Sequence, residues 1–303
     1  MADHARDDTV GFVGLGMMGA PMAANILRKG FPLVVHDRHP QACDGLAAEG
    51  AGPCDTPAAV ADRARTIVVM VDTTAQVEEV IFGPQGIHAA ARSGDVVLCM
   101  STIDPAAARR FARTLADRDI GLIDSPVAGM QAGAIAGTLR AYVGGEADVL
   151  ASCRPVLEAM ATTIVHIGGP GQGLAMKLVN NMLCQVGWVA ASEALAVGAK
   201  AGLDRAQMVE LLCAASGDSA ALRYLGPRWL KRDFDGIRLD ITYKDMQHQI
   251  DMGKALGVPM PMANTAQQIY EMARCKGYGD EDGVAVIKVY EELAGLNETG
   301  HRG

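Results

Sequence analysis

The segment Val10-Gly-Phe-Val-Gly-Leu-Gly-Met-Met-Gly19 is the most informative about the fold. The apolar run Val10–Val13 has the character of a short strand, and a helical pattern extends from Met18 to Arg28. Between them, a G-x-G-x-x-G pattern supplies a tight turn, an approach for phosphate to the backbone, and close packing of helix on strand. This arrangement predicts a dinucleotide-binding turn formed by Gly14, Leu15, Gly16, Met17, Met18 and Gly19. The alternative is a glycine turn with a structural role only.

The second predicted strand, Leu33–His36, ends at an acidic residue, Asp37. In dinucleotide-binding folds a carboxylate at this position hydrogen-bonds the ribose hydroxyls, and its charge repels the 2′-phosphate of NADP. Arg38 and His39 follow directly, and they could accommodate that phosphate or could be solvated loop residues. The sequence therefore predicts NAD in preference to NADP, with Asp37 and Arg38 in the cofactor site.

Strands and helices alternate along the first half of the chain, which is typical of a parallel sheet covered by helices on both faces. Further strands are predicted at Thr66–Val71, Val96–Met100, Leu122–Ile123, Tyr142–Gly145 and Thr163–Ile167. Helices are predicted between strands at Pro57–Arg63, Val77–Ile81 and Pro105–Arg118. Val71 and Asp72, where the third strand ends, extend the predicted cofactor site.

After the run Gly168-Gly-Pro-Gly-Gln-Gly173, nearly every segment has helical character. One helix is predicted from Leu174 to about Gly202, and polar residues such as Asn180 mark it as a buried helix rather than a membrane span. The sequence thus predicts an α/β chain with two domains. Residues 8–172 would form a Rossmann domain with a doubly wound parallel sheet, and residues 173–297 an all-α domain built on a long interdomain helix.

Composition and charge exclude several classes of protein. The 303 residues are 50% hydrophobic, which is too apolar for a disordered chain. The net charge is −8 and no basic stretch occurs, which argues against nucleic-acid binding. Seven widely separated cysteines form no C-x-x-C pair, which predicts free thiols in a reducing compartment and no metal site. Because the N-terminus is polar and lacks an apolar signal core, we expect a cytoplasmic protein.

Catalytic candidates lie at the start of the long helix. Hydride transfer from an alcohol requires a group that accepts the hydroxyl proton. Lys177 and Asn181 are four residues apart, so both project from one helix face, directly after the turn Gly171–Gly173. The positive end of the helix dipole and partial burial would lower the pKa of Lys177 toward the range useful for proton transfer. The alternative is a surface lysine whose stem covers apolar neighbours.

In these motifs the chain resembles the β-hydroxyacid dehydrogenases, the family of 3-hydroxyisobutyrate dehydrogenase and tartronate semialdehyde reductase. The resemblance covers nearly the whole chain. Its motifs, in order, are Gly14–Gly19, Ser101-Thr102 followed by Pro105, the segment Asp124–Leu139, the pattern G-x-G-x-x-x-K-x-x-N-N at Gly171–Asn181, and Lys244-Asp245.

The resemblance implies a role for each matching residue. Lys177 would be the general acid/base, and Asn181 would hydrogen-bond the substrate. Thr102 would lie beside the nicotinamide ribose. Lys244 would close over cofactor and substrate, with Asp245 supporting the site. It also implies metal-free catalysis on a small hydroxy acid or semialdehyde by a homodimer or homotetramer.

One segment departs from the family pattern D-x-P-V-S-G-G. Here Ala128 removes the serine hydroxyl and Met130 replaces a small residue, while the backbone N–H groups of Gly129 and Met130 remain as donors for a substrate carboxylate. One hypothesis is a substrate with a larger or less polar group beside Met130. The other is that both substitutions are neutral and the substrate is unchanged. Ser219 is predicted either to touch substrate or to cap a helix.

Two other functions share this architecture. Imine reductases resemble the fold but generally lack the catalytic lysine, so Lys177 argues against that activity. A non-catalytic NAD(P)-binding reader domain would be expected to lose the lysine or to carry a basic module, and the chain does neither. The sequence therefore predicts an NAD(P)-dependent oxidoreductase acting on a small 3-hydroxy acid or its semialdehyde.

Overall fold

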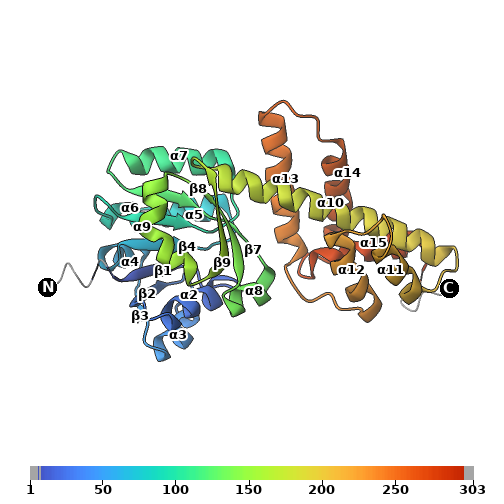
Figure 1. Ribbon diagram of the computed structural model, residues 1–303, viewed down its shortest axis with the longest axis horizontal. Coiled ribbons are helices and arrows are strands. Elements are labelled where there is room, and N and C mark those ends of the chain that lie inside the picture. Colours follow the sequence, from blue (N-terminus) through green and yellow to red (C-terminus); the bar gives the residue numbers. More distant parts are fainter. Residues whose placement is uncertain (1–5, 7, 297–303) are drawn as a thin grey trace. The chain divides into compact units, whose positions relative to one another are not determined.

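The computed structural model describes Arg6 and residues 8–296, and the chain forms two compact units, residues 1–177 and 178–303. The first unit is a sheet flanked by helices, and the second is helical (Figure 1). The helix α10 (Gln172–Lys200) contributes residues to both units. The division therefore falls within this helix, after the predicted boundary at 172/173, and the predicted end of the second domain at residue 297 lies outside the described residues.

The sheet of the first unit has the strand order β3-β2-β1-β4-β5-β6-β8-β7. Its parallel part comprises β1 (Val10–Val13), β2 (Leu33–His36), β3 (Gly52–Pro53), β4 (Thr66–Val69), β5 (Val96–Cys99) and β6 (Gly121–Asp124). The chain builds outward from β1 through β2 and β3, then returns to add β4 on the other side of β1. This reversal is the topological switch point at which doubly wound sheets bind ligands.

Beyond β6 the sheet is mixed, which the sequence analysis did not predict. β7 (Val127–Ala128) and β6 both pair antiparallel with β8 (Leu139–Gly144), while β9 (Ala161–Gly168) pairs parallel with β8. A parallel neighbour would need a long crossover over one face of the sheet. Here the chain instead reverses through the short helix α8 (Met130–Ala136), so β8 runs against β6. The predicted doubly wound sheet is confirmed, with this antiparallel extension.

Alternating side chains of the strands divide the core of the first unit into two layers. Phe12, Val35 and Leu98 pack in one cluster, and their neighbours Val13, Val34 and Val97 pack in the other. The first layer is covered by α2 (Gly19–Arg28), α3 (Asp44–Ala48) and α9 (Ala147–Glu158). The second is covered by α4 (Pro57–Arg63), α5 (Thr74–Phe82), α6 (Ile87–Ala90) and α7 (Pro105–Ala116). Both faces of the parallel strands β1, β2, β4 and β5 are therefore buried, as their apolar sequences predict, whereas much of β9 is exposed.

Capping side chains determine where several of these helices begin. Thr73 accepts the N–H of Gln76, and the Gln76 side chain returns the bond in a capping box, so α5 begins three residues before the predicted Val77. The side chains of Thr56 and Asp104 accept backbone N–H groups at the starts of α4 and α7. A 3₁₀ turn, η1 (Pro40–Cys43), leads from the end of β2 toward α3.

The second unit is built from helices packed on the C-terminal part of α10. They are α11 (Arg205–Cys213), α12 (Ala220–Lys231), α13 (Leu239–Ala255), α14 (Pro261–Cys275), the 3₁₀ turn η2 (Gly283–Val286) and α15 (Ile287–Ala294). Trp188, Trp229 and Tyr270 supply the large rings of its core. The buried Trp229 indole donates to Glu291 at 2.8 Å, so its polar group is satisfied within the core. The predicted all-α domain is thus observed.

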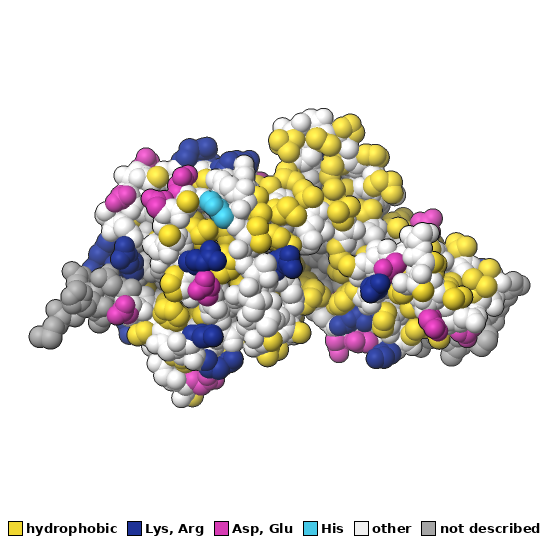
Figure 2. All heavy atoms as spheres, in the orientation of Figure 1, with side chains coloured by type: hydrophobic (Ala, Val, Ile, Leu, Met, Phe, Trp, Pro, Cys, Tyr) yellow, Lys and Arg dark blue, Asp and Glu magenta, His cyan; other side chains and the backbone are white. Residues whose placement is uncertain are grey.

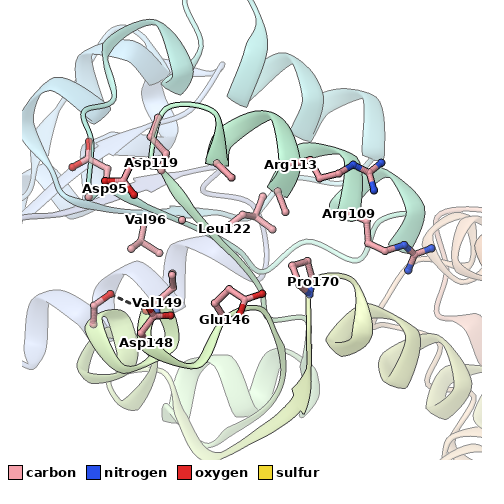
Figure 3. Close-up of a pocket in the computed structure, with 16 residues that line it drawn as sticks. Asp95, Val96, Arg109, Arg113, Asp119, Leu122, Glu146, Asp148, Val149 and Pro170 are labelled. Carbon is pink, nitrogen blue, oxygen red and sulfur yellow. Dashed lines mark hydrogen bonds between the residues drawn. The ribbon is translucent and has the colours of Figure 1, made fainter.

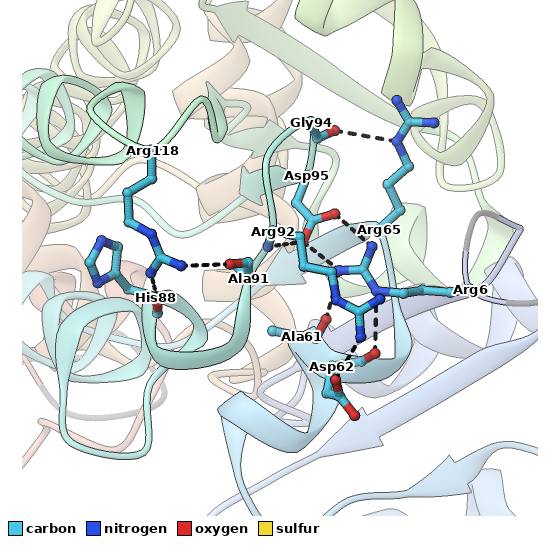
Figure 4. Close-up of polar contacts among 10 residues, drawn as sticks. All are labelled: Arg6, Ala61, Asp62, Arg65, His88, Ala91, Arg92, Gly94, Asp95 and Arg118. Carbon is cyan, nitrogen blue, oxygen red and sulfur yellow. Dashed lines mark hydrogen bonds and ion pairs between the residues drawn. The ribbon is translucent and has the colours of Figure 1, made fainter. Parts of the chain in front are cut away.

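A buried ion pair joins Arg6 to Asp95 (Figure 4). Arg6 Nη1 donates to Asp95 Oδ1 at 2.9 Å, Nη2 donates to the other carboxylate oxygen, and the guanidinium also reaches the carbonyls of Ala61 and Asp62. Asp95 is 1% exposed and also accepts the N–H of Arg92. Removing one partner of a buried pair leaves a charge with reduced compensation in a region from which water is excluded.

We expect Arg6→Ala to lower the free energy of unfolding by about 3 kcal/mol, because the Asp95 carboxylate would remain buried. Urea unfolding monitored by circular dichroism measures this. The matched control is Arg92→Ala, which removes an ion pair with Asp62 whose side chains are 50% and 65% exposed and should cost less than about 1 kcal/mol. Equal losses in the two variants would contradict the importance assigned to burial.

Candidate functional site

The glycine turn after β1 is packed so closely that two of its glycines have no room for a side chain. Gly14 has a φ of +98°, and a Cβ there would lie 2.2 Å from the carbonyl oxygen of Met70. A Cβ on Gly19 would lie 2.0 Å from the carbonyl oxygen of Gly14. In contrast, a Cβ on Gly16 would meet nothing within 4 Å. Gly16 is therefore the position where the backbone faces open space.

The helix that follows this turn has an N-terminus without a side-chain cap. Met18 occupies the N-cap position of α2 and makes no capping hydrogen bond. The first N–H groups of a helix lack partners within the helix, and together with the helix dipole they attract anions. The turn and the helix end therefore have the chemistry of a phosphate cradle.

A cavity of about 520 Å³ lies at the carboxyl ends of β1, β2 and β4. Its walls bring together predicted cofactor residues from three separate loops: Gly14, Leu15, Gly16, Asp37, Arg38, Val71 and Asp72. Thr102, Met17, Met18 and Gly19 are not among the residues that line it. The cavity sits at the switch point of the sheet, where this fold binds its ligands.

Asp37 ties the end of β2 to the glycine turn. Its Oδ2 accepts the N–H of Leu15 at 2.7 Å, and its Oδ1 accepts the N–H of His39 at 2.8 Å. The carboxylate is thus held at the wall of the cavity, with lone pairs left for further donors. Arg38 lies beside it, and its Nε donates to the His39 ring at 3.2 Å.

Two residues that the sequence analysis did not assign to the site position the loop after β4. The hydroxyl of the buried Ser101 accepts the N–H of Val71 at 2.8 Å. The side chain of Gln76 accepts the N–H groups of Asp72 and Thr73 at 2.9 and 3.1 Å. The T-x-x-Q capping-box pattern at Thr73–Gln76 is the sequence signal that could have identified the second contact.

The segment predicted to hold the substrate forms the turn from β7 into α8. Ala128 ends β7, Gly129 has a φ of +133°, and Met130 begins α8 with a φ of +59°. A side chain in this left-handed region costs about 1–2 kcal/mol, and such strain concentrates at functional sites. Met130 therefore adopts a backbone conformation that a glycine would adopt without strain.

The start of α10 is seated against β6 and β8 of the first unit. The buried Asp124 accepts the N–H of Gly171 at 2.6 Å through Oδ1 and that of Leu174 at 2.9 Å through Oδ2. Burial raises the pKa of the Asp124 carboxyl, and these N–H donors oppose that rise. Lys177 follows one turn later and is partly buried. Asn181 lies a further turn along the same helix.

In the second unit, Asp245 connects two residues of the predicted site. Asn181 Nδ2 donates to Asp245 Oδ2 at 3.0 Å, and Lys244 Nζ lies 3.2 Å from Asp245 Oδ1. Asp245 is 5% exposed, so both contacts are largely shielded from water. One turn further on both helices, Gln249 donates to Gln185 at 2.6 Å and continues the polar contact between α13 and α10.

Ser219 occupies the N-cap of α12, where its hydroxyl accepts the N–H of Leu222 at 3.1 Å. Of its two predicted roles, the structure shows the cap.

Among Arg6 and residues 8–296, no three His, Cys, Asp or Glu side chains are grouped to hold a metal ion. All seven cysteines are free thiols. By length and composition α10 alone among the described helices could cross a membrane, but core helices of soluble proteins pass the same test.

Comparison with known families identifies both halves of the chain. The model of the NAD binding domain of 6-phosphogluconate dehydrogenase matches residues 9–168. The model described as NAD-binding of NADP-dependent 3-hydroxyisobutyrate dehydrogenase matches residues 171–290. The two matches account for most of the described residues, and the gap between them falls in the glycine-rich run before α10.

Individual relatives match over nearly their whole length. The chain is 36% identical to 2-(hydroxymethyl)glutarate dehydrogenase of Eubacterium barkeri, over 96% of this chain and 97% of the relative. It is 34% identical to NAD-dependent L-serine dehydrogenase of Pseudomonas aeruginosa, over 94% and 99%. The structure of Mycobacterium tuberculosis 3-hydroxyisobutyrate dehydrogenase with L-serine aligns with a TM-score of 0.85 and 32% identity, covering 93% and 98%. The predicted resemblance is confirmed, and the chain belongs to the β-hydroxyacid dehydrogenase family of NAD(P)-dependent oxidoreductases.

Proposed function

We propose that this chain transfers a hydride between NAD and a small 3-hydroxy acid or its semialdehyde, with Lys177 exchanging the hydroxyl proton. The observation that carries the proposal is the seat of α10. Its first turn is fixed to the sheet by Asp124, and Lys177 and Asn181 follow on successive turns. A general base must be held in a fixed position relative to the substrate, and anchoring the start of α10 meets this requirement for Lys177.

The chemistry divides between the cofactor and the chain. When bound, the nicotinamide accepts a hydride from the alcohol carbon or returns one to the aldehyde. In the oxidative direction, neutral Lys177 takes the hydroxyl proton at Nζ as the carbonyl forms, and in the reductive direction its ammonium returns that proton. Asn181 would orient the substrate, and the Asp245 carboxylate holds the Asn181 amide. This use of Lys177 favours a dehydrogenase over an imine reductase.

The residues of the cavity are suited to a dinucleotide. Gly16 would face the pyrophosphate, the uncapped end of α2 would add N–H donors, and Asp37 would accept the ribose hydroxyls. The negative charge of Asp37 supports NAD over NADP. The names of the relatives do not decide the choice, because one is NAD-dependent while a matching family model is named for an NADP-dependent enzyme.

The substrate would place its carboxylate at the turn from β7 into α8. Ala128 offers no hydroxyl there, so the donors would be the backbone N–H groups of Gly129 and Met130. The bulky apolar side chain of Met130 supports a substrate with a larger or less polar group beside it. Neutral substitution with an unchanged substrate remains the competing explanation.

Exposed apolar side chains in the second unit support assembly into a homodimer or homotetramer. Val179, Leu183 and Val197 share one face of α10, and Leu183 is 72% exposed. Leu256 at the end of α13 and Met262 in the first turn of α14 are also exposed, and Figure 2 shows hydrophobic side chains gathered over this end of the two helices. Exposed apolar side chains gathered in this way are typical of protein interfaces.

Gly16→Ala should leave the free protein as stable as before, or more stable by up to about 1 kcal/mol, because the added methyl meets nothing. It should weaken NAD binding by at least about tenfold, because the methyl would separate the pyrophosphate from the backbone. Calorimetric titration measures the binding. Gly19→Ala, whose methyl would clash with Gly14, should instead lower stability. Unchanged NAD affinity in Gly16→Ala would contradict the cradle.

The wild-type enzyme should show a higher kcat/KM with NAD than with NADP, because Asp37 repels the 2′-phosphate. In Asp37→Asn this charge is removed, and the ratio of the two kcat/KM values should fall by about tenfold or more. Arg38→Ala serves as the comparison and should impair NADP use more than NAD use. A wild-type preference for NADP would refute the role of Asp37.

Lys177→Ala should bind cofactor normally and lose turnover by about 10²- to 10⁴-fold, the range that general acid–base catalysis contributes. The assay follows nicotinamide absorbance over a panel of short 3-hydroxy acids and semialdehydes that includes L-serine and 2-(hydroxymethyl)glutarate. Lys200→Ala, at the other end of the same helix, is the control and should retain activity. Full activity in Lys177→Ala would overturn the proposed mechanism.

A further inference from the structure

We propose that Asp124, the last residue of strand β6, is a positioning residue for Lys177. Its carboxylate would cap the N-terminus of α10 in place of a residue of the helix's own sequence. The proposal rests on the proposed role of Lys177 in proton transfer. Within the first unit, β6 ends at Asp124, and the helix that begins beside it carries Lys177 on its second turn. The cap would fix the position and rotation of that turn.

The helix has no cap from its own sequence. The residues before and at its start are Gly168-Gly-Pro-Gly-Gln-Gly173, which contain no Ser, Thr, Asp or Asn to accept the first N–H groups. Asp124 accepts one of them, from Leu174 at 2.9 Å, and it also accepts the N–H of Gly171, the residue before the helix, at 2.6 Å. Its side chain is 0% exposed, so water cannot replace these bonds. A carboxylate is also favoured at the positive end of the helix dipole.

The backbone around this cap is closely packed at the start of α10. A Cβ on Gly173 would lie 2.3 Å from the carbonyl oxygen of Tyr142, and one on Gly144 would lie 2.6 Å from Asp124 Oδ1. Gly171 has a φ of +83°, and a Cβ there would lie 2.7 Å from the carbonyl oxygen of Pro105. Because strand backbone, helix backbone and carboxylate touch directly, a change at Asp124 must be transmitted to the first turns of the helix.

Asp124→Asn tests the cap because it keeps the size of the side chain but not its two acceptors. An amide presents one oxygen, so its NH₂ group would face the N–H of either Gly171 or Leu174. We expect kcat to fall by about 10- to 100-fold, the effect of misplacing a catalytic group by about 1 Å, with the KM for NAD little changed.

A double-mutant cycle with Lys177→Ala separates positioning from general damage to the fold. If Asp124 acts through Lys177, adding Asp124→Asn to Lys177→Ala should lower the residual kcat by less than about twofold. The matched control is Asp282→Asn, a change at another buried carboxylate that accepts two backbone N–H groups. Asp282→Asn should change kcat by the same factor in the wild-type protein and in Lys177→Ala. An Asp124→Asn effect of equal size in both backgrounds, or no effect on kcat, overturns the proposal.

Hydrogen–deuterium exchange of the peptide spanning residues 169–178 tests the cap independently of turnover. Asp124→Asn should accelerate exchange there, and unchanged exchange overturns the proposal. If Lys177→Ala proves fully active, the proposed function fails while this exchange result still decides whether Asp124 caps α10. Should Asp124→Asn not fold, Asp124→Glu keeps the charge and displaces the acceptors by one methylene. Unchanged kcat in that variant would likewise overturn the proposal.

Discussion

Two hydrogen bonds to the buried carboxylate of Asp124, from the N–H groups of Gly171 and Leu174, fix the start of α10, the helix that carries Lys177, to the sheet. A long helix that begins in a glycine-rich run has no cap from its own sequence. Asp124 of the sheet supplies a cap, and the close backbone contacts at Gly144 and Gly173, together with the buried Leu174, hold the start of the helix. The glycine-rich run supplies no capping side chain for α10, but its lack of Cβ atoms allows the backbone to pack directly against the sheet.

Polar side chains also hold the backbone at several points where loops leave the carboxyl ends of the strands. Asp37 bonds the glycine turn, Ser101 bonds the loop after β4, and Asp124 bonds the start of α10. Each lies at the carboxyl end of a parallel strand. The other large cavity, about 600 Å³ between α7 and α9, reaches the amino ends of β5 and β6 instead (Figure 3). There Arg109 and Arg113 point outward from α7, and no residue of the predicted site lines the cavity.

The parts of the fold that sequence analysis predicted are those with a local physical signal. The glycine turn, the apolar strands and the long helix each carry one, and so does Asp37. The helix α9 was not predicted because Pro155 lies inside it, where proline normally ends a helix. The antiparallel direction of β8 is set by its pairing with β6, and the hydrogen bond between Asp124 and Gly171 joins residues 47 positions apart. Neither feature leaves a pattern in the local sequence. Lys244 and Asn181 were expected in one site from family resemblance, and their shared contact with Asp245 is a tertiary feature.

A crystal structure of the protein with NAD and an unreactive 3-hydroxy acid analogue tests the role of Lys177 most directly. The Lys177 amine should lie within about 3 Å of the analogue's hydroxyl oxygen, and the analogue's carboxylate should accept the N–H groups of Gly129 and Met130. A hydroxyl bonded instead to another side chain, with Lys177 turned to solvent, would show that this lysine does not carry the proton.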